Sequence, residues 1–202
     1  MKRWGLALIA LVAVVTVVAL VGCSSGGPKV GAKATMEEAL TAFKAGDLNK
    51  FGSFLEGSAD GQLADEVVGS LDIDPELANR FISAWCQSVE FNVVSAEESG
   101  NSATAKVEIA AVNFMKLMEQ QQEQIIADLT SNPSAYAGLS DEELEEKITT
   151  LVFEEVIKAF GSAERELPQT EIIILAVDKS GAEPKWVIVG DNLITALFPG
   201  ML

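Results

Sequence analysis

Residues 88–112 read SVEFNVVSAEESGNSATAKVEIAAV, and this stretch decides the fold. On either side of Ser99-Gly100-Asn101, apolar and polar residues alternate, so that each half has one apolar and one polar face. A period of two residues is that of a strand with one buried face. Gly and Asn between two such runs are typical of a hairpin turn. The sequence therefore predicts antiparallel strands over 88–97 and 102–112, whose apolar face must be buried against other elements of the chain.

Helices are predicted upstream of the hairpin, where apolar residues recur at spacings of three and four. The first is expected to start at Thr35, because Thr35 and Glu38 have the spacing of a capping box. A second short helix is expected over 48–55 and a third over 62–71. Asp74-Pro75 predicts the start of a fourth, with an N-cap followed by proline at the first helical position.

Downstream, the period returns to that of a helix. Two helices are predicted, over 114–130 and from Ser140 to Gly161, the second with a capping box. Strands over 170–178 and 185–189 follow, and Asp191 is expected to cap a last short helix. Strand pairs and segregated helices in this order predict an α+β domain. We expect one curved antiparallel sheet with helices on its concave face and a two-helix insertion between the strand pairs.

The N-terminus carries a different signal. Two basic residues precede 19 uncharged positions, Trp4–Gly22. That length suits a bilayer-spanning helix and also a secretory signal. Leu20-Val21-Gly22-Cys23 resembles the lipobox of bacterial lipoproteins, in which a peptidase cuts before a lipid-modified cysteine. The resemblance implies a lipoprotein signal peptide over 1–22 and lipid attachment, with palmitate among the acyl chains, at Cys23. The alternative is an uncleaved membrane anchor with a coincidental cysteine.

The domain organisation follows from this assignment. Residues 23–34 are expected to be a lipidated flexible tether, because the segment is polar and rich in Ser and Gly. Residues 35–202 are expected to form a single extracytoplasmic domain. Each buried acyl methylene contributes roughly 0.8 kcal/mol, so two or three chains anchor a protein stably on a membrane. The predicted location is the extracytoplasmic face of the cell membrane, at the cell surface or in the periplasm.

The charge of the chain excludes several classes of function. It has 30 acidic against 14 basic residues, a formal net charge of −16 and no histidine. An acidic body is repelled by nucleic acid, so no nucleic-acid partner is expected. Without histidine there is no Ser-His or Cys-His nucleophile and no histidine metal ligand. Cys86 has no disulfide partner once Cys23 is acylated, and we expect it to be a small buried thiol.

The body also resembles a known group of proteins. Ala45-Gly46-Asp47-Leu48 at the end of a helix, the hairpin, and Lys185-Trp186-Val187-Ile188 followed by Asp191 and an apolar tail carry the resemblance. They are similar to uncharacterised bacterial lipoproteins with a cystatin-like, or nuclear-transport-factor-two-like, domain. The resemblance covers 35–202 and implies a concave pocket on the sheet. This fold hosts both enzymes and binding modules, so the fold does not assign a function.

Several groups of side chains are candidates for cation or ligand sites. Asp141–Glu146 is interpreted as the negative first turn of a helix and Asp72–Asp74 as a helix cap, each in preference to a cation site. Gln120–Gln124 is interpreted as an exposed helix face in preference to a sugar or peptide site. No metal or cofactor is expected. The candidate ligand-binding residues are Tyr136, in the loop between the inserted helices, and Trp186, which core packing explains equally well.

These observations favour a membrane-anchored, non-catalytic module that binds a small molecule or a protein. The alternative is an enzyme of the same fold that uses a buried carboxylate in the concave pocket. Its candidates are four acidic residues on the predicted strands, and the hypothesis fails if all of them face solvent: Glu90, Glu108, Glu171 and Asp178. A solute receptor of a transporter is ranked last, because such receptors are usually two-lobed and larger.

Overall fold

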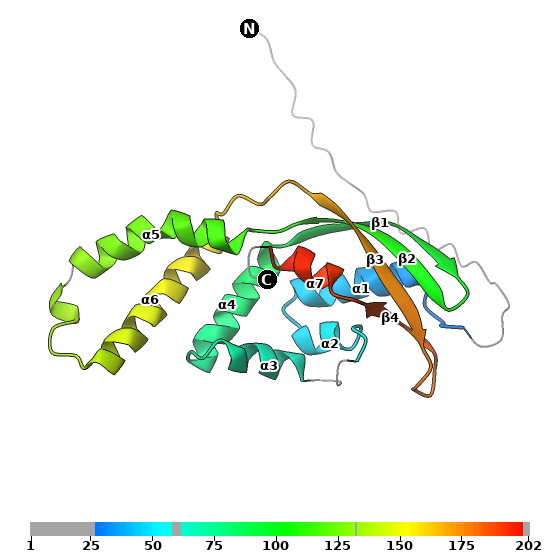
Figure 1. The fold of residues 1–202 in the computed structure, drawn as a ribbon, viewed down its shortest axis with the longest axis horizontal. Coiled ribbons are helices and arrows are strands. Elements are labelled where there is room, and N and C mark those ends of the chain that lie inside the picture. Colours follow the sequence, from blue (N-terminus) through cyan, green and yellow to red (C-terminus); the bar gives the residue numbers. More distant parts are fainter. Residues whose placement is uncertain (1–26, 58–61, 132, 200–202) are drawn as a thin grey trace, which may run out of the picture.

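The computed structural model describes residues 27–57, 62–131 and 133–199. Within these ranges the chain has an α+β architecture, with seven α-helices, one 3-10 helix and one antiparallel sheet of four strands (Figure 1). The elements are α1 (Ala32–Lys44), α2 (Leu48–Gly52), α3 (Leu63–Ser70), α4 (Pro75–Ser88), β1 (Glu90–Ser99), β2 (Ser102–Ala110), α5 (Phe114–Ser131), η1 (Pro133–Ala135), α6 (Asp141–Phe160), β3 (Gln169–Asp178), β4 (Lys185–Val189) and α7 (Asn192–Leu197). The predicted order of helices and strands is confirmed. The predicted signal peptide 1–22 and Cys23 lie outside the described residues.

The four strands pair in chain order, and all three pairings are antiparallel. The predicted hairpin at Ser99-Gly100-Asn101 is confirmed, with Gly100 at φ 63°, a conformation that suits glycine. β1 carries a register shift between Val93 and Ser95, which the alternation did not predict. The pairing of β2 with β3 joins the two predicted strand pairs into a single sheet.

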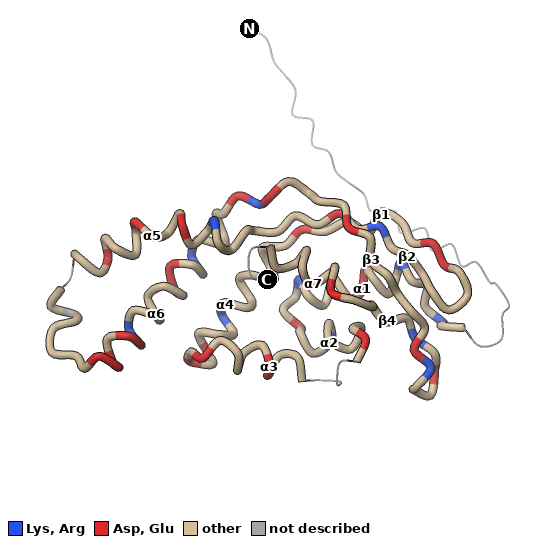
Figure 2. The backbone as a smooth tube through the Cα atoms, in the orientation of Figure 1, with Lys and Arg blue, Asp and Glu red and all other residues tan. Residues whose placement is uncertain are grey.

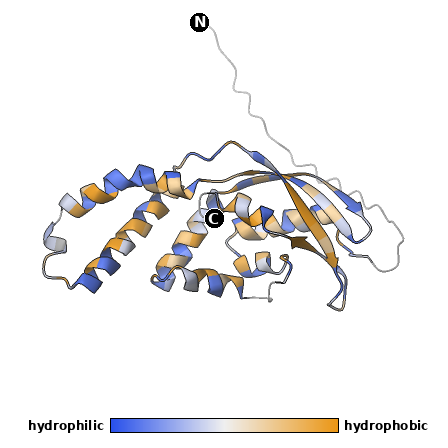
Figure 3. Cartoon of the chain, viewed as in Figure 1, coloured by the Kyte–Doolittle hydropathy of each residue, from blue (hydrophilic) through white to orange (hydrophobic). Residues whose placement is uncertain are grey.

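One face of the sheet is buried by helices. Along β2, the side chains of Ala103, Ala105, Val107 and Ile109 are buried, whereas Thr104 and Lys106 between them are exposed. Figure 1 shows α1 and α7 lying on the same side of the sheet, and Figure 3 shows β3 as a largely hydrophobic strand. Two of the buried side chains on β2 are alanines, Ala103 and Ala105, and α1 contributes buried alanines of its own.

The start of α1 differs from the prediction. The helix begins at Ala32, so the last three residues of the predicted tether 23–34 are helical. Thr35 makes no capping box, since it lies inside the helix with 5% of its surface exposed. The first turn is satisfied instead by Glu98 of β1, whose Oε1 accepts the Ala32 N–H at 2.6 Å. A carboxylate far along the chain therefore replaces the local cap.

The other predicted helix starts have different outcomes. Asp74 caps α4, because its Oδ1 accepts the N–H groups of Glu76 and Leu77 at 2.9 and 3.1 Å. The capping box between Ser140 and Glu143 is confirmed at the start of α6. Asp191 stands at the N-cap position of α7, but its side chain makes no capping hydrogen bond, so that part of the prediction is wrong.

The helices α5 and α6 form an arm that projects from the body (Figure 1). Both carry hydrophobic and hydrophilic patches along their length (Figure 3). The joint with the body is aromatic, since Phe81 of α4 lies 5.1 Å from Phe153 and 5.7 Å from Phe160, both on α6, between ring centroids. Among the helices in the described ranges, none combines the length and apolarity that crossing a bilayer requires.

Two aspartates at N-cap positions allow a matched test of capping. Asp74→Ala removes both side-chain bonds to α4 and is expected to lower the free energy of unfolding by about 0.5–2 kcal/mol. Asp191→Ala is the control, because within the described chain Asp191 bonds to its helix through the backbone alone, and we expect a loss below about 0.5 kcal/mol. Chemical denaturation followed by circular dichroism measures both. Equal losses would contradict the assignment of the caps.

Candidate functional site

A cavity of about 360 Å³ lies at the end of the sheet where β3 begins. Its walls are the end of β2, the first residues of β3, the helix α7 and the connection from α6 to β3. Figure 1 shows α7 beneath this part of the sheet. The volume falls in the range of roughly 300–1,000 Å³ that small-molecule sites occupy. We call it the sheet-end cavity.

Two glutamates give the sheet-end cavity its chemistry. Glu171 is half-buried on β3 and alternates with Ile173 and Leu175, so it lies on the inner face of the sheet. Glu166 is fixed by two bonds, since its N–H donates to the Ala111 carbonyl at 3.0 Å and its Oε1 accepts from Asn113 Nδ2 at 3.1 Å. Ionised carboxylates only accept hydrogen bonds, and no Lys or Arg is among the described residues that line the cavity. The arrangement suits a ligand that donates hydrogen bonds or carries positive charge.

The remaining polar groups of the cavity come from Gln169, Asn192 and Thr195. The Asn192 side chain is anchored to the sheet, because its Nδ2 lies 3.4 Å from the Ile172 carbonyl. Of the five polar residues that line the cavity, Glu171 alone is a candidate from the sequence. The sequence pointed to Glu171 because that residue lies on a predicted strand. Glu166 lies in a loop, where the sequence has no periodic pattern to indicate which side chains face a cavity.

The four strand carboxylates that the enzyme hypothesis named are divided by the structure. Glu90 is exposed, and Glu108 alternates with the buried residues of β2 and lies on the outer face. Asp178 accepts the Ser180 N–H at 2.8 Å, and this bond lowers the pKa of Asp178. Glu171 is the exception, because it alone of the four shares the inner face with the buried residues of β3. The enzyme hypothesis would fail if all four carboxylates faced solvent, and Glu171 does not.

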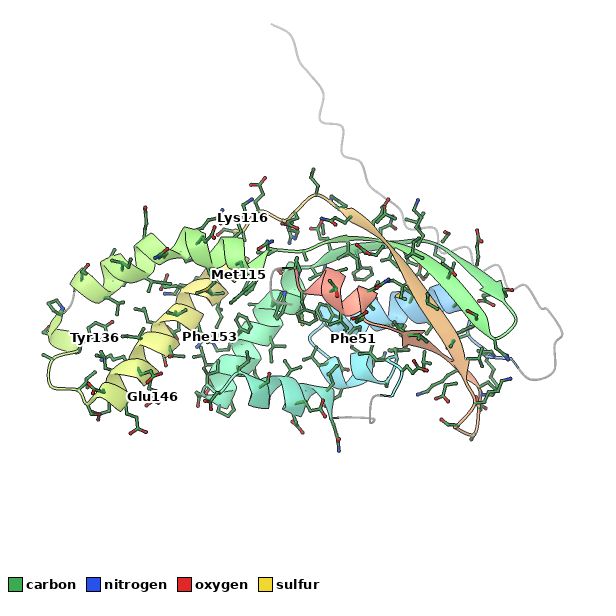
Figure 4. The ribbon with its side chains drawn as sticks, viewed as in Figure 1. Phe51, Met115, Lys116, Tyr136, Glu146 and Phe153 are labelled. Carbon is green, nitrogen blue, oxygen red and sulfur yellow. The ribbon has the colours of Figure 1, made fainter. Side chains whose placement is uncertain are left out.

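The two aromatic candidates lie in different parts of the molecule. Trp186 is 3% exposed, belongs to the hydrophobic core and borders a groove beside the N-terminal segment. Tyr136 lies at the tip of the arm, far from the body (Figure 4). The Lys147 ammonium stands 5.2 Å from the centre of the Tyr136 ring. The structure does not bring Tyr136 and Trp186 together into one site.

The acidic motifs have local structural roles. At the start of α6, the Ser140 N–H and hydroxyl bond to Glu143, which lowers the pKa of Glu143. Figure 2 shows the acidic residues gathered at this end of α6. Asp72 adopts a positive φ of 50° in the turn before α4, which Asp74 caps. In the described ranges, no three His, Cys, Asp or Glu side chains lie close enough together to hold a metal ion.

Cys86 is buried on α4 and lines an apolar cavity, to which α3 and α7 also contribute side chains. Burial raises the pKa of its thiol from 9.0 to about 12, since the thiolate loses its hydration in apolar surroundings. A thiolate is the reactive form of cysteine. The expectation of a small buried thiol is confirmed.

Comparison with known proteins identifies no family for this chain. No protein-family model matches it, and no curated protein does. Among solved structures, a candidate lipoprotein (ycdA) from Bacillus subtilis subsp. subtilis str. 168 is similar, with a TM-score of 0.43 and 12% sequence identity. The alignment covers 82% of this chain and 58% of the Bacillus subtilis protein, so this chain spans less than two thirds of the length of that protein. A likeness at this level assigns neither a family nor a function.

Burial of Cys86 predicts slow chemical modification. At pH 8, a pKa of about 12 in place of 9.0 reduces the thiolate fraction about a thousandfold. Iodoacetamide is therefore expected to label Cys86 at that pH only as fast as the protein unfolds, as measured by mass spectrometry. A Cys86→Ala chain is the control, because any label that it takes is at Cys23. Labelling of Cys86 within minutes in the folded protein would contradict its burial.

The same pKa has a consequence for stability. Because the folded-state pKa is raised, the stabilisation by the neutral thiol is complete below about pH 9 and is lost as the pH rises toward 12. The free energy of unfolding of the chain should therefore fall more steeply above pH 9 than that of Cys86→Ala. Parallel pH profiles from chemical denaturation would contradict this expectation.

Proposed function

We propose that this chain is a bacterial lipoprotein, held by acylated Cys23 on the extracytoplasmic face of the membrane, that binds a small ligand without converting it. The lipobox-like Leu20-Val21-Gly22-Cys23 after a basic and apolar segment supports the anchor. The described chain begins next to the body, where the Lys29 ammonium contacts Glu183. In this proposal the body is a single domain, joined to the lipid anchor at Cys23 by a short tether.

The proposal includes the family of the domain. A four-stranded antiparallel sheet with helices on one face supports a cystatin-like, or nuclear-transport-factor-two-like, domain. In that assignment, the arm of α5 and α6 is an insertion between the strand pairs β1–β2 and β3–β4. The arm leaves the sheet-end cavity open, since no residue of α5 or α6 is among its described lining.

The single observation that carries ligand binding is the sheet-end cavity with Glu171 on its inner wall. The cavity is lined by apolar residues of β2 and α7 and by two carboxylates, with no described basic residue to neutralise them. Charge-assisted hydrogen bonds to a carboxylate are about twice as strong as neutral ones. We infer that the ligand is a small molecule with a cationic or strongly hydrogen-bond-donating group. No nucleic acid is proposed as a partner, because the chain is strongly acidic.

A carboxylate-dependent enzyme is the second candidate, and the position of Glu171 favours it too. The two candidates differ in what Glu171 does. In a binding protein, its charge recognises the ligand, so Glu171→Gln loses the ligand. In an enzyme that uses Glu171 for proton transfer, Glu171→Gln still binds and retains unconverted substrate.

The lipid anchor is tested by metabolic labelling with palmitate. Cys23→Ala is expected to lose all label, because Cys23 is the proposed acyl acceptor. Its location does not decide the test, because an uncleaved apolar segment over Trp4–Gly22 would hold the variant at the membrane. Cys86→Ala is the control and should keep both label and location, since Cys86 is buried in the body. Label that persists in Cys23→Ala would overturn the anchor.

Ligand binding is tested by native mass spectrometry of the full chain purified from its own host. We expect an added small-molecule mass in the natural protein and a loss of roughly tenfold or more of that species in Glu171→Gln, given about 1.5–3 kcal/mol for a charged hydrogen bond. Glu108→Gln is the matched control, because it makes the same change on the outer face of the neighbouring strand. An unliganded mass in all three proteins would count against a small ligand, and binding retained in Glu171→Gln would favour the enzyme.

A further inference from the structure

The described chain begins beside the turn between β3 and β4. The Lys29 ammonium contacts the Glu183 carboxylate of that turn, and both residues border the same groove. The Ala32 N–H donates to Glu98 of β1, so the segment before α1 is fixed to the body at two places. We call residues 27–33 and 178–185 together the anchor end of the molecule.

The anchor end lies opposite the arm. Figure 1, in which the longest axis is horizontal, shows the turn between β3 and β4 at one end and the arm at the other. Figure 4 shows Tyr136 at the tip of the arm. The 20 residues of α6 alone span about 30 Å. The tip of the arm therefore lies far from the place where residues 27–33 join the body.

The proposed anchor places the bilayer close to the anchor end. Only Ser24–Gly26 separate Cys23 from Gly27, the first described residue. An extended chain covers at most roughly 3.6 Å per residue, so the reach from Cys23 to Gly27 is at most about 14 Å. This short reach brings the anchor end to the membrane. It leaves open whether the arm points away from the bilayer or lies along it.

The distribution of charge distinguishes these two orientations. The arm and its tip, residues 114–160, have ten acidic and three basic residues, whereas residues 27–57 have four of each. At the turn between β3 and β4, Figure 2 shows basic and acidic residues mixed. Charges repel one another within a Debye length, which is about 8 Å at physiological salt. An anionic bilayer therefore repels the arm much more strongly than the anchor end.

We propose that the anchor end faces the head groups of an anionic bilayer and that the negative charge of the arm holds the arm away from them. This inference rests on the membrane anchor of the proposed function and adds the orientation of the body. The partner of the anchor end is a lipid surface. The tip of the arm, with Tyr136, is then the part of the body that lies farthest from the membrane.

The test compares the distances of two engineered cysteines from the bilayer. Ala137→Cys lies at the tip of the arm and Ala182→Cys in the turn between β3 and β4, and both alanines are exposed. Each full chain is labelled with a maleimide donor dye and placed in nanodiscs of anionic phospholipid that carry an acceptor dye on some head groups. Cys86 takes up little dye, because it is buried and the pKa of its thiol is raised to about 12.

Energy transfer falls steeply with distance, so we expect several-fold stronger transfer from position 182 than from position 137 at low salt. Raising the salt from about 0.01 M to about 1 M shortens the Debye length from roughly 30 Å to 3 Å. The repulsion of the arm is then screened, so transfer from position 137 should rise while that from position 182 changes little. Nanodiscs of zwitterionic phospholipid should give the same rise at low salt.

Two results would overturn the proposal. Equal transfer from the two positions in anionic nanodiscs at low salt would show that the body lies along the bilayer. A difference that stays the same at high salt and in zwitterionic phospholipid would show that the charge of the arm does not set the orientation.

The same pair of cysteines is also measured in a Cys23→Ala background. There the uncleaved apolar segment Trp4–Gly22 holds the chain at the membrane, and the distance to the body is equally short. Dye taken up rapidly by the chain without an engineered cysteine would reveal a free Cys23 and count against acylation. The Cys23→Ala pair would still decide the orientation, so failure of the lipid anchor and failure of this inference are distinguishable.

Discussion

The packing around Phe81 is the contact on which the two halves of this structure depend. Phe81 is 1% exposed on α4, and its ring meets those of Phe114, Phe153 and Phe160 from the arm at 5.1–6.0 Å. Aromatic pairs contribute about 0.5–1.5 kcal/mol each beyond the area they bury. Three such pairs amount to a large share of the 5–15 kcal/mol by which domains are stable. Beyond this joint the arm is loosely buried, since α5 contributes only two buried residues.

The same stripe of α4 continues one turn later at Trp85, which lines a small apolar cavity inside the layer of helices. Phe81 and Trp85 are 5.7 Å apart between ring centroids, so one helix face serves both the arm and the cavity. A buried donor without a partner costs about 1–3 kcal/mol. The Trp85 indole N–H is such a donor among the described residues, and the surrounding packing tolerates its cost.

Charge links the sheet-end cavity to the proposed location. The chain carries a formal net charge of −16, and its field concentrates cations near the surface. Glu166 and Glu171 place part of that charge inside a cavity, where screening by water is weaker than at the surface. The same field repels anionic lipid head groups, so a body tethered through Cys23 would stand clear of the membrane. The cavity would then stay open to small cationic molecules from outside.

The sequence by itself determined the elements whose signals are local. The alternation in 88–112, the cap at Asp74-Pro75 and the capping box at Ser140 are satisfied within a few residues, and all three are present in the structure. Only the tertiary structure decided how distant groups meet. Glu98 caps α1 across 66 positions, and Asn113 holds Glu166 across 53. Both cavities are likewise made by elements far apart along the chain. Periodicity reports which face of a strand or helix is buried, but not which distant side chain fills or leaves empty the space against it.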